Sequence, residues 1–413
     1  MVVKKMYSCS VFYHTKTARS LLMNRLYLFY FSMMVFVYSV SAQQVESEFS
    51  FATDFNVRPT FVEGNSPFFV NSGKWIYLGK TADFDEPGLY FYDTISKTRI
   101  YRPIPLEIYY QNHPTQFLGQ IETKGKRLPL TVYEFLFYDE TTKRAGFVIE
   151  NKDKSINTKR YLFMGWDLAT NNIDVVEFIY EIGKDDKKSF AQSSAIGYSQ
   201  EDNTGYFTFA VDNDLKDDES EDVTAFIYKI QNQNLTKLQE YKSKFYPYTP
   251  EFHPDSKQIL IASYAEAFQN RNPTGYLYKI NSDSLLKLSI PSTPYGISFS
   301  KDGKFLYIAA SDTGEVRKYN TDNLSDIKTS KWGTHGHKLG FWKDGELVWV
   351  RNSGLHIYDP ITLKQKTVIP TKKFYKKHVN VSGSTFLPFQ KLLLRNILED
   401  PAGGAANRIL VSP

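Results

Sequence analysis

One phrase of the sequence recurs at a regular interval in the second half of the chain, and this recurrence limits the fold more than any other feature. Residues 293–320 read "TPYGISFSKDGKFLYIAASDTGEVRKYN", and similar stretches lie directly before and after them. When the copies are aligned, Asn281, Asn320 and Asp359 occupy the same position and follow one another at intervals of 39 residues. Self-similarity at a fixed period predicts a repeat architecture in which each copy folds as one supersecondary unit.

The residues of one copy indicate four antiparallel strands. The runs "GISFS", "FLYIAA" and "EVRKYN" are short and contain β-branched and aromatic residues, and "LSDIKTS" supplies a fourth segment. The intervening "KDGK" and "SDTG" contain residue pairs that tolerate the positive φ of tight hairpin turns. A four-stranded meander with a period of about 40 residues is typical of a propeller blade. We therefore predict an all-β fold, a single β-propeller of four-stranded antiparallel blades.

Looser copies of the phrase extend toward the N-terminus. Their third strands are predicted to end at Asp93, Asp167 and Gln231, and insertions such as the acidic segment 212–222 explain the irregular spacing. Because an open ring would expose unpaired strand edges, we expect one blade to combine a strand near Phe51 with the C-terminal strands. Counting that blade gives seven, and six or eight blades remain open as alternatives.

The N-terminal segment indicates export. Basic residues precede an uncharged apolar run over residues 26–42, which ends in Val-Ser-Ala and is followed by polar residues from Gln43 onward. This pattern predicts a leader over residues 1–42 with a secretory signal peptide, and a propeller domain over residues 43–413. An uncleaved membrane anchor is the alternative, because the run approaches the length needed to span a bilayer. We expect a secreted or periplasmic protein without stable membrane insertion.

Composition excludes several classes of function. The only cysteine is Cys9, so the chain has no intramolecular disulfide and no cysteine-ligated metal. The net charge of +5 arises from 50 basic and 45 acidic residues, a near-balanced mixture that gives no indication of nucleic-acid binding. Aromatic residues make up 16% of the chain, which favours β structure. No cofactor is predicted, and we expect a monomer.

The repeat also resembles known propeller families. "TPYGISFSKDGKFLYIAASDTGEVRKYN" is similar to the repeat of the YVTN and lactonase-like seven-bladed β-propeller superfamily, and "PEFHPDSKQILIAS" is similar to the propeller repeats of the periplasmic Tol-system protein. The clear match covers residues 246–370. The resemblance implies a propeller, but members of this group include sugar lactonases, lyases and interaction modules, so the fold alone leaves the activity undecided.

Internal alignment of the copies predicts a ring of side chains at the mouth of the central channel. Tyr248, Tyr295 and His337 each lie four residues before an equivalent phenylalanine on the way into an innermost strand, and Tyr375 is the matching residue of the last copy. Aromatic and imidazole groups in such a ring would bind a flat, partly polar ligand such as a sugar. The alternative interpretation is that these rings plug the channel or pack between blades.

The segment "GTHGHK", residues 333–338, holds the most reactive local chemistry. In an extended backbone His335 and His337 would lie on one face, where they could bind a ligand together or where His337 could act as a general base. Glu251 enters a neighbouring innermost strand and could converge with them. Two histidines do not make a metal site, and we predict none. A polar turn with exposed histidines is the structural alternative.

Two hypotheses of function remain. The first is an exported propeller that serves as a ligand-binding or protein-interaction module of the cell envelope or exterior, with an unknown protein or small molecule as its partner. The second is a lactonase-like hydrolase or lyase that acts on a small sugar-derived substrate at the mouth of the channel, with His337 as the catalytic base. The chain has no nucleophile elbow, phosphate loop, zinc-protease motif or dinucleotide fingerprint, so whether it is an enzyme stays undecided.

Overall fold

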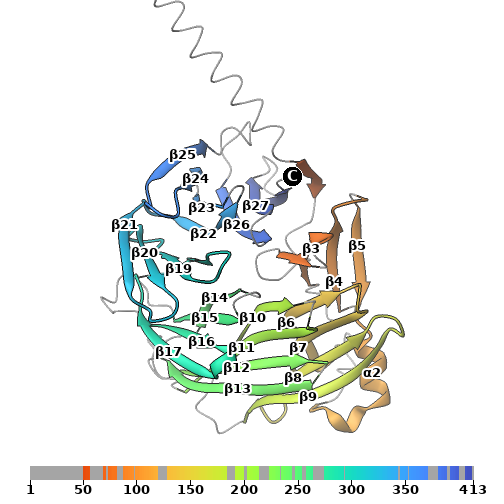
Figure 1. Ribbon diagram of the computed structural model, residues 1–413. Coiled ribbons are helices and arrows are strands. Elements are labelled where there is room, and N and C mark those ends of the chain that lie inside the picture. The colour runs from red at the N-terminus through yellow and green to blue at the C-terminus, as the bar shows by residue number, and fades with distance from the viewer. Residues whose placement is uncertain are drawn as a thin grey trace, which may run out of the picture.

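The computed structural model of the protein consists of antiparallel sheets arranged in a ring (Figure 1). It describes the following residues: 50–55, 68–70, 73–80, 87–96, 98–119, 128–183, 191–199, 202–213, 223–232, 234–243, 247–253, 257–263, 274–292, 294–342, 345–351, 353–370, 380–387, 391–399 and 405–411. The predicted leader over residues 1–42 lies outside this range. Within it, none of the helices is long and apolar enough to cross a membrane.

Six blades each consist of four consecutive strands that pair in chain order. Blade 1 contains β2 (Phe68–Val70), β3 (Trp75–Lys80), β4 (Gly88–Asp93) and β5 (Arg99–Pro103). Blade 2 contains β6 (Leu130–Asp139), β7 (Arg144–Asp153), β8 (Thr158–Asp167) and β9 (Asn172–Ile182). Blade 3 contains β10 (Ala191–Ser199), β11 (Thr204–Asp212), β12 (Val223–Gln231) and β13 (Asn234–Ser243).

The second half of the chain continues the same pattern with shorter strands. Blade 4 contains β14 (Pro247–His253), β15 (Gln258–Ser263), β16 (Thr274–Lys279) and β17 (Ser284–Ser289). Blade 5 contains β18 (Gly296–Phe299), β19 (Phe305–Ala309), β20 (Glu315–Asn320) and β21 (Asp326–Lys331). Blade 6 contains β22 (Gly336–Trp342), β23 (Glu346–Arg351), β24 (Gly354–Tyr358) and β25 (Gln365–Pro370).

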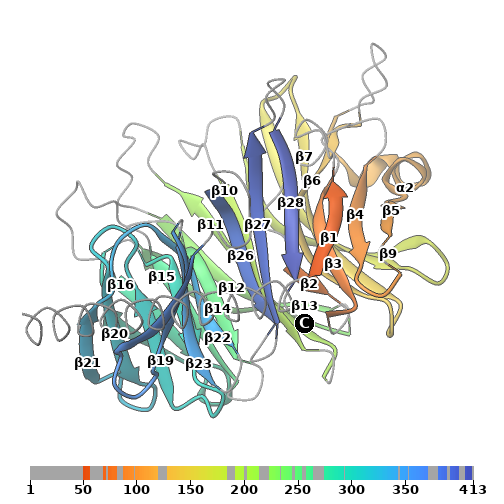
Figure 2. The same cartoon turned by 90° about the horizontal axis from the view of Figure 1, so that it is seen from above.

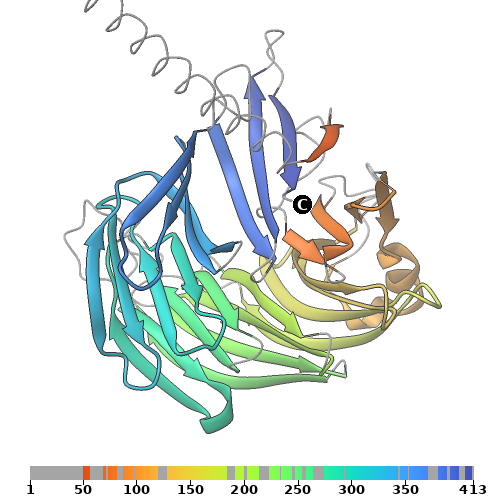
Figure 3. The same cartoon turned by 45° about the horizontal axis from the view of Figure 1, so that its top comes forward.

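The remaining four-stranded sheet is assembled from both ends of the chain. It pairs β1 (Ser50–Phe55) with β28 (Ala405–Val411), followed by β27 (Lys391–Glu399) and β26 (Asn380–Leu387), and these strands lie side by side in Figure 2. Its innermost strand β26 contacts β22 on one side and β2 on the other, so it closes the ring (Figure 3). The prediction of a single all-β propeller with four-stranded antiparallel blades is confirmed, and the chain forms six continuous blades plus this composite sheet.

The turns after the third strands explain why the repeat ends in Asp or Asn. Asp93, Asp167 and Asp359 each follow or end a third strand, and one carboxylate oxygen of each accepts hydrogen bonds from the backbone N–H groups two and three residues later. Asn320 accepts one such bond from the N–H of Asp322. These side chains therefore satisfy the backbone of the turn locally, as Asx turns do. The predicted ends of the third strands at Asp93, Asp167 and Gln231 match the ends of β4, β8 and β12.

The hydrophobic core lies between neighbouring blades. Separate clusters of buried side chains fill the spaces between blades 1 and 2, 2 and 3, 3 and 4, 4 and 5, and 5 and 6. The middle strands are consequently buried on both faces, and every residue of β11 is buried. This double burial explains why "TGYFTFAVD" is a nearly continuous apolar run without alternation.

One insertion departs from the repeat. Between β5 and β6 the chain forms the short helix α2 (Leu106–Asn112) and a 3-10 turn, η3 (Pro114–Gln116). Leu106 and Tyr110 of α2 join the core between blades 1 and 2. A second 3-10 turn, η5 (Ile280–Ser282), follows β16. The sequence did not indicate α2, because seven residues are too few to show a helical period.

Candidate functional site

The candidate site lies where the innermost strands of blades 4, 5 and 6 meet at the centre of the ring. The innermost strands β14, β18 and β22 contact one another in that order. We call the end of the ring at which these strands begin the entry face. It also carries the turns that join second and third strands, because alternate strand ends of an antiparallel blade lie at the same end.

An ion pair joins two blades that are not neighbours in the ring. Lys338 Nζ on β22 lies 2.8 Å from Glu251 Oε2 on β14, across the position of β18. Their side chains retain 21% and 27% of their accessible surface, so the pair is shielded but not dry. A hydrogen-bonded ammonium–carboxylate pair at this distance is among the stronger polar contacts in proteins. It neutralises both charges and connects the two blades.

Two glycines at the starts of β18 and β22 leave room for the ring of a buried tryptophan, Trp349. A Cβ atom at Gly296 on β18 would lie 2.2 Å from the Trp349 ring, and one at Gly336 on β22 would lie 1.9 Å from the same ring. Trp349 is fully buried. The two glycines of the repeat therefore allow the indole to pack against the backbone where blades 5 and 6 begin.

The predicted extended backbone through the two histidines is not observed. His335 is exposed, precedes β22 and has φ of 60°, which places it in the left-handed region. Its N–H donates to the carbonyl oxygen of Ser311 at 2.7 Å. The neighbouring carbonyl of Thr334 accepts a hydrogen bond from Arg351 Nε at 2.9 Å. These contacts fix the segment as a turn on the entry face, so the rule that alternate residues share a face does not apply to His335 and His337.

His337 occupies a β-bulge. In the pairing of β22 with β23, Gly336 lies opposite Arg351 and Lys338 lies opposite Val350, so His337 is the extra residue between them. A bulge redirects side chains and frequently occurs next to functional sites. The side chain of His337 lies outside the described part of the structure, and its predicted catalytic role stays a prediction.

The three predicted tyrosines have different outcomes. Tyr295 precedes β18 and is half-buried against the hydrophobic cluster between blades 5 and 6, as the packing alternative expected. Tyr248 lies on β14, which confirms its place at the start of an innermost strand, but its side chain is not described. Tyr375 lies outside the described residues.

Sequence reasoning missed a polar contact beside this face. Ser292, in the connection that leads to β18, donates a hydrogen bond from its hydroxyl to Asp312 Oδ2 at 2.8 Å. Asp312 belongs to the turn between β19 and β20, next to Ser311. The turn is therefore held from both sides, by Ser292 and by His335. Only the tertiary structure brings these segments together.

A buried carboxylate on another innermost strand was also missed. Glu134 on β6 is 9% exposed, and its charge adds to the effect of burial in raising the pKa of the Tyr77 hydroxyl well above its usual value. Tyr133, the residue before it, donates a hydrogen bond to the carbonyl oxygen of Ala191 at the start of β10. No sequence motif marks Glu134, because the bulge between Val132 and Glu134 shifts the alternation of the strand.

The site thus consists of loops held in place by hydrogen bonds on the entry face, with the Glu251–Lys338 ion pair between the innermost strands. Within the described ranges, no three His, Cys, Asp or Glu side chains gather in a way that could hold a metal ion. Glu251 and Lys338 are engaged with each other, and His335 is exposed on the rim. This arrangement can present hydrogen-bonding groups and an imidazole to a partner on the entry face.

Comparisons with known proteins support the fold. No protein-family model matches the chain, and no curated protein matches it. The structure is similar to a chain in the crystal structure of the mitotic checkpoint complex, with a TM-score of 0.50 and 10% identity, covering 86% of this chain and 90% of that chain. Lower similarities are found to Saccharomyces cerevisiae Sqt1 (TM-score 0.46, 11% identity, 84% and 83% covered) and to U3-55K (TM-score 0.47, 9% identity, 89% and 98% covered).

The ring of four-stranded antiparallel blades defines the class as a β-propeller protein. A propeller of this kind holds loops from several blades in fixed positions on one face, which suits it to bind a partner.

Proposed function

We propose that the protein is an exported β-propeller that binds a protein or small-molecule partner at the cell envelope or exterior, through its entry face at the mouth of the central channel. The observation that carries this proposal is the Glu251–Lys338 pair. Each charge is matched by the other, so the pair acts as a brace between blades 4 and 6 and keeps the rim loops in place. Export rests on the predicted signal peptide, and the relationship to the YVTN and lactonase-like propellers is part of the proposal.

Site-specific crosslinking tests the binding face. Because Cys9 is the only cysteine and lies in the predicted leader, the chain from Gln43 onward contains none. His335→Cys places one thiol on the entry face, and Ile361→Cys places one at a turn after a third strand, on the opposite face, where Ile361 is 74% exposed. We expect a thiol-reactive crosslinker to give a discrete covalent adduct between the partner and the His335→Cys variant. The Ile361→Cys variant should give no such adduct. Equal adducts from both positions, or adducts only from 361, would contradict the proposal.

A lactonase-like hydrolase or lyase is the second candidate, favoured by the β-bulge at His337 near the start of β22. In this reading the substrate is a small sugar-derived ester, His337 is the general base and the Lys338 ammonium polarises the carbonyl. Release of acid from sugar lactones, measured by pH-stat, tests it. Activity lost in both His337→Gln and Lys338→Met would support the enzyme. Absence of turnover in the wild-type protein would leave the binding function.

A further inference from the structure

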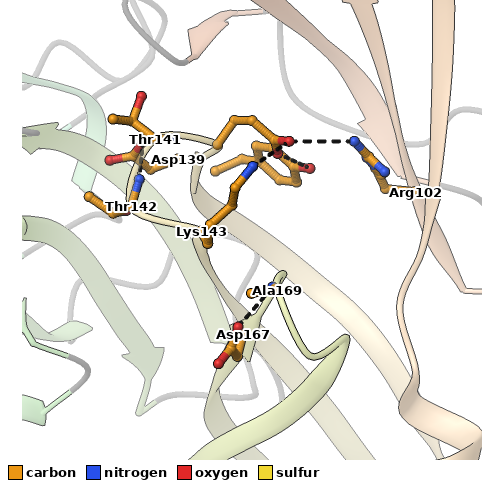
Figure 4. A network of polar contacts seen from close by, with 9 residues as sticks. Arg102, Asp139, Thr141, Thr142, Lys143, Asp167 and Ala169 are labelled. Atoms are coloured by element: carbon orange, nitrogen blue, oxygen red, sulfur yellow. Dashed lines mark hydrogen bonds and ion pairs between the residues drawn. The ribbon is translucent and has the colours of Figure 1, made fainter.

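A buried carboxylate at the end of β6 lacks a partner for one of its oxygens. Asp139 is fully buried. Its Oδ1 accepts hydrogen bonds from the N–H groups of Thr141 at 2.8 Å and Thr142 at 3.1 Å. Its Oδ2 is also buried and has no hydrogen-bond partner. Figure 4 shows Asp139 between Thr141 and Thr142 in this turn. The carboxylate is thus half satisfied in a place that water does not reach freely.

The same turn elsewhere in the molecule does not create this problem. Asp93, Asp167 and Asp359 also accept two backbone N–H groups through Oδ1, but each of them is partly exposed. Asp167 additionally lies 3.8 Å from the Arg144 guanidinium. Turn formation therefore does not require a buried second oxygen, and Asp139 is the exception among these four.

The cations near Asp139 are engaged by other residues. Arg144, which lies opposite Asp139 in the pairing of β6 with β7, forms ion pairs with Asp167 and Asp174. Glu140 Oε1 lies 2.9 Å from Lys143 Nζ and 3.8 Å from Arg102 Nη2, and Glu140 Oε2 accepts a hydrogen bond from the Tyr138 hydroxyl at 3.1 Å. In Figure 4 Arg102 lies well apart from Asp139. No ion pair to Asp139 occurs among the described residues. Its negative charge is buried without a matching positive charge.

Two further oxygens approach the same place. Thr142 Oγ1 is buried in the same turn. Tyr198 reaches this point from β10 of blade 3, where its ring stacks on Phe137 at 4.4 Å, and its hydroxyl donates to Asn203 Oδ1 at 3.4 Å. Burial raises the pKa of Tyr198 to about 12, a hydrogen bond with the Thr142 side chain opposes this rise, and the charge of Asp139 adds to it. The hydroxyl of Tyr198 therefore lies beside the Thr142 side chain and is influenced by the charge of Asp139.

We propose that Asp139 Oδ2, Thr142 Oγ1 and the hydroxyl oxygen of Tyr198 bind a small cation between blades 2 and 3. A buried carboxylate is stable when its charge is paired, and a water molecule would satisfy its hydrogen bonding without pairing the charge. Carboxylate and hydroxyl oxygens are hard ligands, which select Na⁺, K⁺, Mg²⁺ or Ca²⁺ over softer metals. Because Tyr198 lies on β10 of blade 3 and the other two ligands lie at the end of β6 in blade 2, the bound ion connects blades 2 and 3.

Thermal unfolding of the purified protein in different chloride salts tests the site. The reference salt is tetramethylammonium chloride, whose cation is too large for a buried site, and NaCl, KCl, MgCl2 and CaCl2 are compared with it at equal ionic strength. We expect at least one of these cations to raise the unfolding midpoint by a few degrees, with a dependence on concentration that saturates.

Three variants assign the effect to these residues. Asp139→Asn keeps an oxygen for the turn but removes the charge, and we expect its midpoint to be the same in all five salts. Asp167→Asn alters an equivalent but exposed turn and should keep the wild-type response. Thr142→Val preserves the shape of the side chain. It should raise several-fold the cation concentration that gives half of the increase in the unfolding midpoint. This variant serves as the test if Asp139→Asn does not fold.

Two outcomes would overturn the proposal. One is a wild-type midpoint that is equal in all five salts, which would assign the pocket to water. The other is a cation response that persists unchanged in Asp139→Asn and Thr142→Val, which would place the ion elsewhere.

Discussion

The ammonium nitrogen of Lys318 lies 4.0 Å from the centroid of the Phe305 ring, in a position where the lysine is only 7% exposed. The same nitrogen donates a hydrogen bond to the carbonyl oxygen of Pro360, in the last turn of blade 6, at 3.3 Å. Burial lowers the pKa of Lys318, with a further lowering from Lys328. A lysine from the third strand of blade 5 thus connects two blades through an aromatic face and a backbone carbonyl.

This lysine should make the stability of the protein depend on alkaline pH. The pKa of Lys318 in the folded protein lies below the value of about 10.4 in the unfolded chain. Between these two pKa values the unfolded state binds more protons than the folded state. The contribution of Lys318 to the free energy of unfolding therefore rises with pH in this range. In Lys318→Met that contribution is absent. Urea unfolding of the wild type and of Lys318→Met should be measured between pH 8 and about 10. The difference between their free energies of unfolding should change with pH over this range. A constant difference would contradict the assignment.

The ion pair between Glu251 and Lys338 should stabilise the ring measurably. A double-mutant cycle with Glu251→Gln and Lys338→Met is expected to give a coupling energy of about 1–2 kcal/mol, because the pair is shielded and its partners are well aligned. High salt should reduce this value only in part. The exposed pair Lys237–Glu240, with side chains 51% and 52% accessible, is the control and should give well under about 1 kcal/mol. Equal coupling in the two pairs would show that Glu251 and Lys338 do not brace the blades.

His356 should make the fold sensitive to acid. It is 7% exposed on β24, and burial lowers its pKa, with Arg351 acting in the same direction and the hydrogen bond to Gln365 acting against it. The unfolded chain therefore takes up a proton at higher pH than the folded one, and stability is lost as the pH falls below about 6.5. His356→Gln should lose less stability between pH 7 and about 5, as measured by chemical unfolding. A loss equal to that of the wild type would assign the acid sensitivity to other groups.

Gly336 should not tolerate a side chain. An alanine there would place its Cβ 1.9 Å from the buried Trp349 ring, and overpacking of this kind costs about 1–3 kcal/mol. Gly345→Ala is the matched control, since no atom lies within 4 Å of its Cβ position and only its φ of 76° opposes alanine. Unfolding midpoints should fall further for Gly336→Ala than for Gly345→Ala. The reverse order would mean that the indole can move aside.

The blades could be predicted because their determinants are local. Asp93, Asp167 and Asp359 form hydrogen bonds with their own turns, two and three residues away, so the repeat shows the end of each third strand directly. Tyr295 could be placed at an entry to an innermost strand, but whether its ring faces a ligand or a neighbouring blade could not be predicted. That choice depends on the volume left by blade 6, which the alignment of repeats does not contain.

The candidate site could be predicted only in part, because its contacts cross between blades. Glu251 appeared as a candidate, but its partner Lys338 lies 87 residues away and on the second blade beyond it. The bulge at His337 and the left-handed backbone at His335 break the alternation on which the paired-histidine hypothesis depended. Asp139 belongs to the same class of turn as three other aspartates, and no local pattern distinguishes it from them.

The sequence by itself determined the repeat unit, its antiparallel strands and the turns between them, since hairpin geometry and Asx turns depend on residues a few positions apart. Only the tertiary structure decided which charges are paired, which oxygens are buried and which rings fill the spaces between blades. Those properties arise when sheets that are distant in the chain pack face to face and exclude water, and the free energy of a charge or a polar oxygen depends on that surrounding far more than on its neighbours in sequence.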